Sequence, residues 1–564
     1  MNGAAQLMQG HEVIAPIVLP LLAGSVLVLL EKSRSRWVPL VSLCATGLLL
    51  LLSVLLVMQA SGGEVQPYLL GNWQAPFGIS LALDRLSALM LLLTAAVASG
   101  ALVYAVAGKA GRSEAAQGEH FHSLFQYQLM GLCGAFLTAD LFNLFVFFEV
   151  LLAASYGLLL HGATRARLKA SVHYVVFNLS SSALFLIAVS LLYALTGTLN
   201  MADLALKLPL LRPEDARLAQ AAALLLLVVF AVKAALLPLY FWLPDTYAAA
   251  SAPVAALFAI MTKVGVYAIA RMTTLLFGVS SGGATAGVAA VALPVLALGT
   301  LVLAAIGALA ATRLRGLVAY LVVGSAGTLL LAIGLGTEGT LAAALFYMVN
   351  STLVAAAWFL LADRISAARG GVDLLDARAL SGGWAPLGLA FLIASVAVAG
   401  VPPLAGFLGK ALLLQAAGQT PMAVWVVALV LGSSLAMMVA LARAGSTLFW
   451  KPGAGGGATV AAHVSAHVST HLPAHVTASG ALAVWPTSAA HIWAIGALLA
   501  AVLASAVAAG SLSAYAGAAA QQLLQRQPYI EAVLGARPVP PKFDVRKEMR
   551  ERARERARES GESK

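Results

Sequence analysis

Charged residues are scarce in this chain of 564 residues: Asp, Glu, Lys and Arg together make up 10%, against 61% hydrophobic residues. Soluble domains carry roughly 25% charged residues, so this chain cannot cover a water-facing surface. The mean hydropathy of +0.91 points the same way. A soluble enzyme, a nucleic-acid-binding protein and a secreted disulfide-rich scaffold are therefore excluded, and the composition predicts a polytopic membrane protein.

Cysteine is almost absent, since Cys44 and Cys133 are the only two and both lie in apolar stretches. Neither a disulfide framework nor a Cys-ligated metal cluster is available to such a chain. Basic residues are also missing before the first apolar run, which argues against a cleaved signal peptide and for a retained first span. The net charge of +11 does not indicate nucleic-acid binding, because nine of the 34 Lys and Arg residues lie after residue 541.

Long apolar runs, by contrast, fill the chain. A helix that crosses a bilayer needs about 20 mainly apolar residues, because its backbone polar groups must be hydrogen-bonded within the segment. The sequence predicts an all-α fold of about fourteen transmembrane helices, with only the turn 138–140 between the fourth and the fifth. The expected spans are 14–30, 37–58, 86–107, 121–139, 141–160, 171–195, 218–240, 253–276, 286–311, 316–336, 341–362, 385–412, 421–448 and 483–508.

Basic residues are concentrated in alternate loops. The loops after the odd-numbered spans hold 14 Lys and Arg residues, and those after the even-numbered spans hold 4. The positive-inside rule then makes the odd-numbered loops cytoplasmic and places both termini on the outer side. The Arg-rich tail over 542–564 also falls outside, but it lies beyond the roughly 15–20 residues over which the rule acts. Its interleaved Glu and Arg residues predict a solvated charged helix, with a docking arm for another protein of the same complex as the alternative.

Four ionisable residues stand out inside predicted spans, where a charge costs from about 2.5 kcal/mol upward. Glu149 lies in the fifth span, Lys233 near the end of the seventh, Lys263 in the middle of the eighth and Lys410 in the twelfth. Buried ion pairs that fix helix packing are one reading of this set. One glutamate cannot neutralise three lysines, however, and burial disfavours the charged form of both residue types. The set therefore favours a proton relay.

Other polar residues in the spans allow two roles. They could hold a chain of water molecules, or they could form hydrogen bonds between helices, which is the commoner role. His173 is more often a satisfied polar residue than a member of a relay. The residues in question are His173, Ser180, Ser181, Ser182, Tyr320, Ser325, Tyr347, Asn350 and Ser395.

Proline interrupts two of the predicted spans. The seventh contains Pro238 and ends at Trp242-Leu243-Pro244-Asp245, and the twelfth is broken at Gly400-Val401-Pro402-Pro403. Carbonyl groups freed at membrane depth need water or protein partners, so broken spans tend to line a cavity. Each break is in the fourth span of a five-span unit, spans 4–8 and 9–13. An odd number of crossings makes two tandem units face opposite ways, which predicts an inverted repeat.

Three segments carry a resemblance to a known family. FNLFVFFEVLLAASYGLLLHG, KAALLPLYFWLPDTYAAASAPVAALFAIMTKVGVYAIAR and AGVPPLAGFLGKALLLQAA resemble the antiporter-like subunits shared by Mrp-type cation/proton antiporters and respiratory complex I. The resemblance covers about residues 120–450. It implies that Glu149 and Lys233 form a functional pair and that Lys263 and Lys410 continue a central hydrophilic axis.

Details favour the D-type subunits of Mrp (also Mnh or Pha) antiporters within that family. Tyr240 and Tyr247, on either side of Asp245, stand where complex I relatives usually have histidines. One departure concerns the eleventh span, where many relatives have His and Lys and this chain has Asn350 and Ala355. Water is the default link between Lys263 and Lys410.

The chain is expected to divide into six parts. They are N-terminal helices (1–119), the first repeat (120–278), the second repeat (286–450), a His-containing flexible loop (451–482), a last span (483–508) and a charged C-terminal tail (509–564). The loop carries four histidines at intervals of four, His463, His467, His471 and His475. Its glycines and proline favour a flexible low-complexity segment over a metal site.

The sequence thus predicts a proton-translocating subunit of a multisubunit Na⁺(K⁺)/H⁺ antiporter in the bacterial inner membrane. Its partners would be the other subunits, protons, monovalent cations and lipid, with no nucleic acid, no cofactor, no bound metal and no enzymatic reaction of its own. One alternative is a proton-pumping subunit of complex I or of a membrane-bound hydrogenase. Another is a self-sufficient solute carrier, although no substrate-selective polar cluster is evident.

Overall fold

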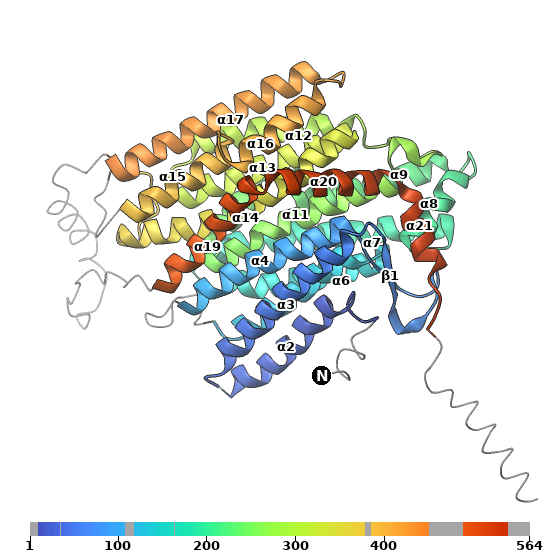
Figure 1. The fold of residues 1–564 in the computed structure, drawn as a ribbon, viewed down its shortest axis with the longest axis horizontal. Coiled ribbons are helices and arrows are strands. Elements are labelled where there is room, and N and C mark those ends of the chain that lie inside the picture. The colour runs from blue at the N-terminus through green and yellow to red at the C-terminus, as the bar shows by residue number, and fades with distance from the viewer. Residues whose placement is uncertain are drawn as a thin grey trace, which may run out of the picture.

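The structure is a computed structural model and describes residues 10–33, 35–107, 118–162, 164–377, 385–450 and 489–539. Nearly all of these residues are helical, and most of the helices run side by side along the long axis of the molecule (Figure 1). Twelve helices in the described ranges are long and apolar enough to cross a membrane. The expected all-α polytopic fold is confirmed.

The helices that position the site are long and joined by short loops. A single hairpin within the described ranges pairs β1 (Gln66–Leu69) with β2 (Ser80–Leu83). The helices are α2 (Ala15–Lys32), α3 (Val38–Ala60), α4 (Arg85–Ala107), α5 (Phe121–Leu137), α6 (Leu141–Leu160), α7 (Arg165–Thr196), α8 (Met201–Lys207), α9 (Ala216–Ala234), α10 (Trp242–Ala249), α11 (Ala252–Leu275), α12 (Ala292–Ala310), α13 (Leu314–Leu335), α14 (Glu338–Ala368), α15 (Ala385–Ala399), α16 (Ala405–Ala417), α17 (Ala423–Gly445), α19 (Ala489–Val507), α20 (Ala509–Leu524) and α21 (Arg526–Gly535).

Each expected span has a counterpart among these helices, although the count of fourteen membrane crossings stays a prediction. The turn at 138–140 does separate α5 from α6, and Asp140 accepts a hydrogen bond from the Asn143 backbone N–H at 2.8 Å as the N-cap of α6. The ninth span begins at Ala292 and not at 286. Gly282, Gly283 and Gly287 have φ of 67° to 75°, which favours turns over helix ahead of α12.

The seventh span breaks earlier than expected, because α9 ends at Ala234 instead of continuing to 240. Ala235 adopts a left-handed conformation with φ of 55° and closes the helix. Hydrogen bonds with protein groups satisfy the backbone groups that the break leaves free. The Leu237 N–H donates to Thr300 Oγ1 at 2.9 Å, and the Trp242 indole N–H donates to the Val232 carbonyl at 3.0 Å. The break therefore survives at membrane depth because neighbouring side chains replace the missing helical hydrogen bonds.

The twelfth span is two half-helices, α15 and α16, on either side of residues 400–404. Gly400 has a φ of 77°, which few other residues would adopt. Two side chains of α14 donate hydrogen bonds to carbonyl groups near the end of α15. The Trp358 indole donates to the Ala394 carbonyl and the Asn350 amide donates to the Ala397 carbonyl, both at 3.2 Å.

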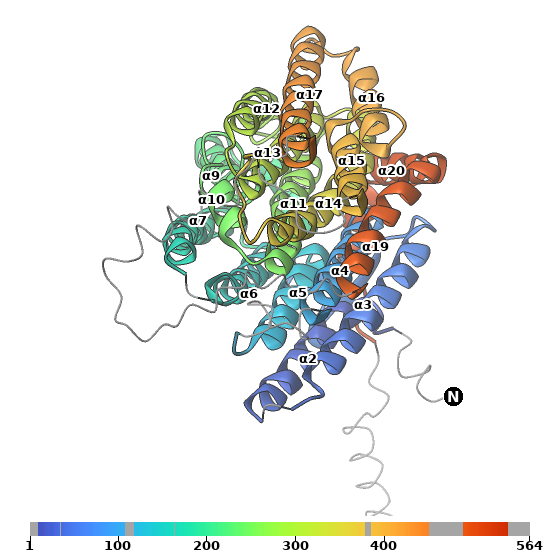
Figure 2. The same ribbon diagram turned by 90° about the vertical axis from the view of Figure 1, so that its left-hand side faces the viewer.

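The core of the molecule lies around α11 and α14. Viewed along the bundle, α11 and α14 lie at the centre, and α2, α7 and α17 lie at the periphery (Figure 2). The spanning segments of α11 and α14 are wholly buried, whereas that of α17 is mostly exposed. Large apolar side chains cover the exposed surfaces, such as Leu29, Leu51 and Val424, as expected for faces that contact lipid.

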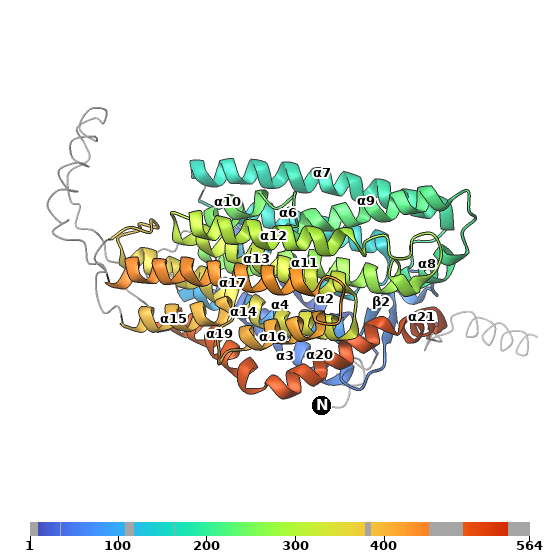
Figure 3. The ribbon, with the colours of Figure 1, turned by 90° about the horizontal axis from the view of Figure 1, so that it is seen from above.

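The C-terminal part differs from the expected charged tail, because residues 509–535 form α20 and α21 and pack on the bundle. Alanine-rich α20 buries Ala516, Ala519, Ala520 and Leu523, and it lies along α14 on the side opposite α7 (Figure 3). The backbone of Val539 exchanges two 2.7 Å hydrogen bonds with the Asn72 side chain. The predicted histidine loop over 451–482 and the Arg-rich segment over 542–564 lie outside the described residues.

Candidate functional site

The four intramembrane charges come from four different helices and lie largely away from solvent. Glu149 is on α6, Lys233 in the last turn of α9, Lys263 on α11 and Lys410 on α16. Lys263 is completely buried, Lys233 and Lys410 are 5% and 7% exposed, and Glu149 is half-buried. None of the three lysines forms an ion pair with a carboxylate within the described ranges.

Helix α7 lies between Glu149 and Lys233 and bonds to both. Ser182 donates a hydrogen bond to Glu149 Oε1, and Lys233 Nζ donates to Asn178 Oδ1 at 3.2 Å. Asn178 and Ser182 are four residues apart and so lie on one face of α7. Lys233 Nζ also lies 5.8 Å from the centre of the Phe148 ring. The expected Glu–Lys pair is therefore not a direct ion pair in the described structure; two neutral side chains of α7 link its members.

Among the described residues Lys263 has a single polar partner, the Ser325 hydroxyl of α13, at 2.9 Å. The helix that carries it packs unusually close to the helix that carries Lys233. A Cβ atom added at Gly265 would lie 2.5 Å from the backbone nitrogen of Ala234. The absence of a side chain at Gly265 thus allows α11 to approach the end of α9 where Lys233 is located.

Replacing Gly265 with Ala is expected to destabilise the protein by about 1–3 kcal/mol, the usual cost of overpacking a core. The added methyl group must push α11 away from the backbone of Lys233 and Ala234. Thermal unfolding of the detergent-purified protein measures the effect. Gly496→Ala is the matched control, because nothing lies within 4 Å of a Cβ there. Equal melting temperatures for the two variants would contradict the close packing of α9 and α11.

Lys410 caps the broken end of α15. Its ammonium group donates to the carbonyl oxygen of Ala399 at 2.9 Å, to that of Val398 at 3.4 Å and to Ser434 Oγ at 2.9 Å. The C-terminal end of a helix carries a partial negative charge, which favours a cation there. A Cβ at Gly400 would lie 2.8 Å from the Lys410 side chain, so the glycine at the break also makes room for the lysine.

An internal cavity connects the partner of Lys263 to Lys410. Its wall combines apolar side chains with hydroxyl groups, one amide and one amine, and Asn350 Oδ1 is buried without a hydrogen-bond partner in the described structure. About 20 Å³ of the cavity is available to the centre of a water molecule. Since one water molecule needs roughly 10–15 Å³ by this measure, the cavity has room for about one or two. The polar lining residues are Ser325, Thr328, Tyr347, Asn350, Ser351, Lys410, Ser433 and Ser434.

Several residues predicted for the site lie elsewhere. His173 is exposed on the outer face of α7, and Asp245 is exposed on α10. Tyr247 is a core residue whose hydroxyl donates to the Phe258 carbonyl at 2.8 Å. Tyr240 is only partly buried and lies beside the break. None of these four side chains has a hydrogen bond to the buried lysines within the described ranges.

Three of the four prolines lie at the two breaks. Pro238, Pro402 and Pro403 are exposed, whereas Pro244 is buried within α10. In the described ranges no group of three or more His, Cys, Asp and Glu side chains could hold a metal ion.

Asn178 and Ser434 bond to Lys233 and Lys410, and the sequence did not identify either of them. Asn178 precedes Ser182 by one helical turn, and this spacing was the available signal. Ser434 lies on α17, and no local pattern relates it to Lys410.

The chain is similar to known proteins in sequence and in fold. Residues 138–436 match the family model described as NADH:quinone oxidoreductase/Mrp antiporter, transmembrane. The chain is 41% identical to the D-type subunit of a probable K⁺/H⁺ antiporter of Rhizobium meliloti (strain 1021) and 36% identical to that of the Na⁺/H⁺ antiporter of Bacillus subtilis (strain 168). Each alignment covers 78% of this chain and 87% of the relative. A chain in the solved Mrp complex from Dietzia sp. DQ12-45-1b superposes with a TM-score of 0.80 at 28% identity, over 93% of this chain and 99% of that one.

Proposed function

The chain belongs to the NADH:quinone oxidoreductase/Mrp antiporter family as a subunit of the D type, and on that premise we propose that it carries protons within a multisubunit cation/proton antiporter. Its partners are the other subunits of the same complex. We place the complex in the bacterial inner membrane, with both termini of this chain on the outer side, because the odd-numbered loops hold most of the basic residues.

The observation that supports this function best is the series of polar groups from α6 to α16. Glu149, Ser182, Asn178 and Lys233 form its first half. In the second half, Lys263 bonds to Ser325, which lines the same cavity as Lys410. An unpaired lysine in such a buried position is costly. Its retention is explained if the amine binds and releases a proton during each cycle.

In the proposed cycle Glu149 and Lys233 act as a coupled pair. A proton bound by one group changes the proton affinity of the other, as expected for interacting sites. Lys233 loses its proton toward Lys263 across the close contact of α9 and α11. Ser325 and water in the cavity then lead from Lys263 to Lys410, and Asn350 takes the place of a titratable side chain as a hydrogen-bonding group.

We assign cation binding to the complex as a whole. The names of the relatives give K⁺ for the Rhizobium meliloti protein and Na⁺ for the Bacillus subtilis protein. The polar groups that line the cavity beside Lys410 are neutral oxygen atoms, an amide and an amine, with no carboxylate among the lining residues. We therefore assign this chain a proton path and place no cation site in this cavity.

Proton/cation exchange in everted vesicles of an antiporter-deficient host tests the function. The chain would be expressed alone and together with the genes of its neighbouring subunits. Exchange of Na⁺ or K⁺ for protons is expected only with the full set. Exchange by the chain alone would instead indicate a self-sufficient carrier. No cation exchange by the full set would favour a redox-driven proton pump, the second function that the family description includes.

A further inference from the structure

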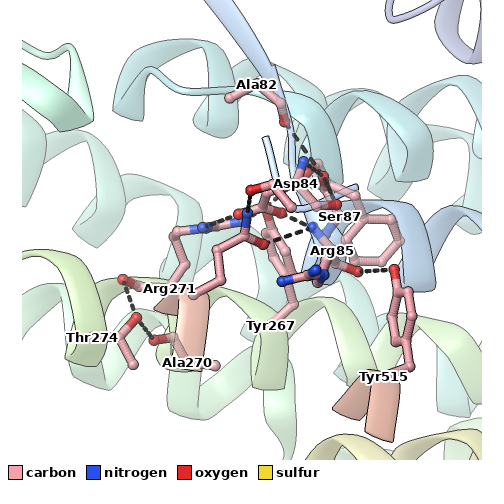
Figure 4. Close-up of polar contacts among 12 residues, drawn as sticks. Ala82, Asp84, Arg85, Ser87, Tyr267, Ala270, Arg271, Thr274 and Tyr515 are labelled. Atoms are coloured by element: carbon pink, nitrogen blue, oxygen red, sulfur yellow. Dashed lines mark hydrogen bonds and ion pairs between the residues drawn. The ribbon is translucent and has the colours of Figure 1, made fainter. Parts of the chain in front are cut away.

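A second cluster of buried charged residues lies near the C-terminal end of α11. Arg271 Nη1 and Asp84 Oδ2 are 2.6 Å apart, with side chains only 6% and 2% exposed. These residues are 187 positions apart in the chain and join α11 to the start of α4 (Figure 4). A buried pair of this kind cannot lose one partner without leaving an uncompensated charge.

Asp84 also acts as the N-cap of α4. Its Oδ1 accepts the Ser87 backbone N–H at 2.8 Å, and its own N–H donates to Ser87 Oγ at 2.8 Å. Backbone donors of this kind and the positive end of a helix stabilise the ionised carboxylate. Asn caps helices about as well as Asp, so the capping role and the charge of Asp84 can be separated by substitution.

The C-terminal helices cover the Asp84–Arg271 pair. The guanidinium of Arg271 lies between two aromatic rings, 5.5 Å from Tyr267 of α11 and 5.1 Å from Tyr529 of α21. Tyr515 of α20 donates to the Arg85 carbonyl at 2.8 Å, as Figure 4 shows, and Arg526 donates to the Leu275 carbonyl at 3.0 Å. These contacts hold α20 and α21 over the pair and keep water away from it.

We propose that Asp84 is a positioning residue for the proton relay, because it neutralises Arg271, whose charge would otherwise act on Lys263 along the same helix. The proposal rests on the function proposed above. Lys263, Tyr267 and Arg271 are spaced four residues apart, on one side of α11. Within the part of the chain that the structure describes, a hydroxyl is the only polar partner of Lys263, so no counter-ion there offsets a nearby positive charge.

The expected size of this effect is measurable. Eight residues at 1.5 Å each separate Lys263 from Arg271 by about 12 Å. At an effective dielectric constant of about 20, a unit charge at that distance shifts the protonation of Lys263 by about one pH unit. Salt screens buried charges only weakly. Among the described residues, the other charged or titratable groups around the site are Arg85, Tyr515 and Arg526 beside the pair, Tyr267 and Tyr529 next to Arg271, and Lys233 on α9.

The test compares the pH profile of proton/cation exchange in the full complex for three variants. With Asp84→Asn, the uncompensated Arg271 disfavours protonation of Lys263, so the profile is expected to move about one unit to lower pH. With Arg271→Gln, the carboxylate keeps its hydrogen bond from the Ser87 backbone, and the profile is expected to move to higher pH by less than one unit, because a buried carboxylate without its cation is partly protonated. The double variant carries neither charge and is expected to return to the wild-type profile.

Opposite shifts that cancel in the double variant cannot come from loosened packing, which would lower exchange at every pH. Profiles that coincide with the wild type in every assembled variant would overturn the proposal. If the complex with Asp84→Asn fails to assemble, the Arg271→Gln and double variants test the proposal. An Arg271→Gln profile that coincides with the wild type then overturns the proposal. Lys263→Met, measured in the same assay, distinguishes a failure of the relay from a failure of the role proposed for Asp84. A fully active Lys263→Met complex refutes the relay itself, whereas an inactive one with unshifted pair variants refutes only the role of Asp84.

Discussion

Replacement of Lys233 by Met, or of Glu149 by Gln, is expected to abolish proton/cation exchange while the complex stays assembled. Met nearly matches the length of Lys but cannot bind a proton, and Gln can still accept the hydrogen bond from Ser182. Removal of a group that transfers a proton typically lowers a rate by about 10²-fold or more. Each variant should therefore lose exchange at every pH, because the coupled pair has lost one of its two titratable members.

The measurement is cation-induced proton movement in everted vesicles, with the amount of assembled complex determined in the same membranes. His173→Ala is the matched control, since His173 lies on α7 with Asn178 and Ser182 but is exposed on its outer face. It should exchange like the wild type. Normal exchange by the Lys233→Met complex would contradict the proposed role of the pair.

Lys410→Met is expected to have an effect of similar size, with a loss of stability in addition. The ammonium group donates to two carbonyls at the end of α15 and to Ser434. Leaving buried acceptors unsatisfied costs about 1–3 kcal/mol. The variant should therefore melt at a lower temperature and show exchange reduced by about 10²-fold or more, because the path ends before the last lysine.

Ser395→Ala on α15 provides the control for Lys410→Met. The Ser395 hydroxyl is buried and has no hydrogen-bond partner in the described structure, so its removal should leave stability and exchange unchanged. Thermal unfolding and exchange are measured on both variants. An active Lys410→Met complex would remove Lys410 from the proton path and leave it as a helix cap only.

The sequence predicted the four charges and the two breaks because both are expensive within a membrane. A charge in a span and a proline in a helix each carry a cost that has to be met locally, so they are visible without any knowledge of neighbours. The exact end of α9 was not predictable, since Ala235 in a left-handed conformation has no signature in the sequence. Proline positions alone suggested a longer helix.

Contacts between distant segments could not be predicted. Asn178 resembles any polar residue that joins two helices, and only the fold brings it to Lys233. Asp84 and Arg271 lie at the edges of their spans, where charges are common, so neither was identified as a buried group. The alanine-rich sequence of α20 is compatible with a tail or with a packed helix. Its burial depends on α14, which the local pattern does not reveal.

Lys263 gives the most direct test of the account, because the proposed path runs through it between Lys233 and Lys410. Proton movement should be recorded with a pH-sensitive dye in vesicles that contain the full complex with Lys263→Met. Exchange is predicted to fall by about 10²-fold or more at every pH, with a normal amount of assembled complex. A Lys263→Met complex that exchanges protons at the wild-type rate would contradict a path through the buried lysines.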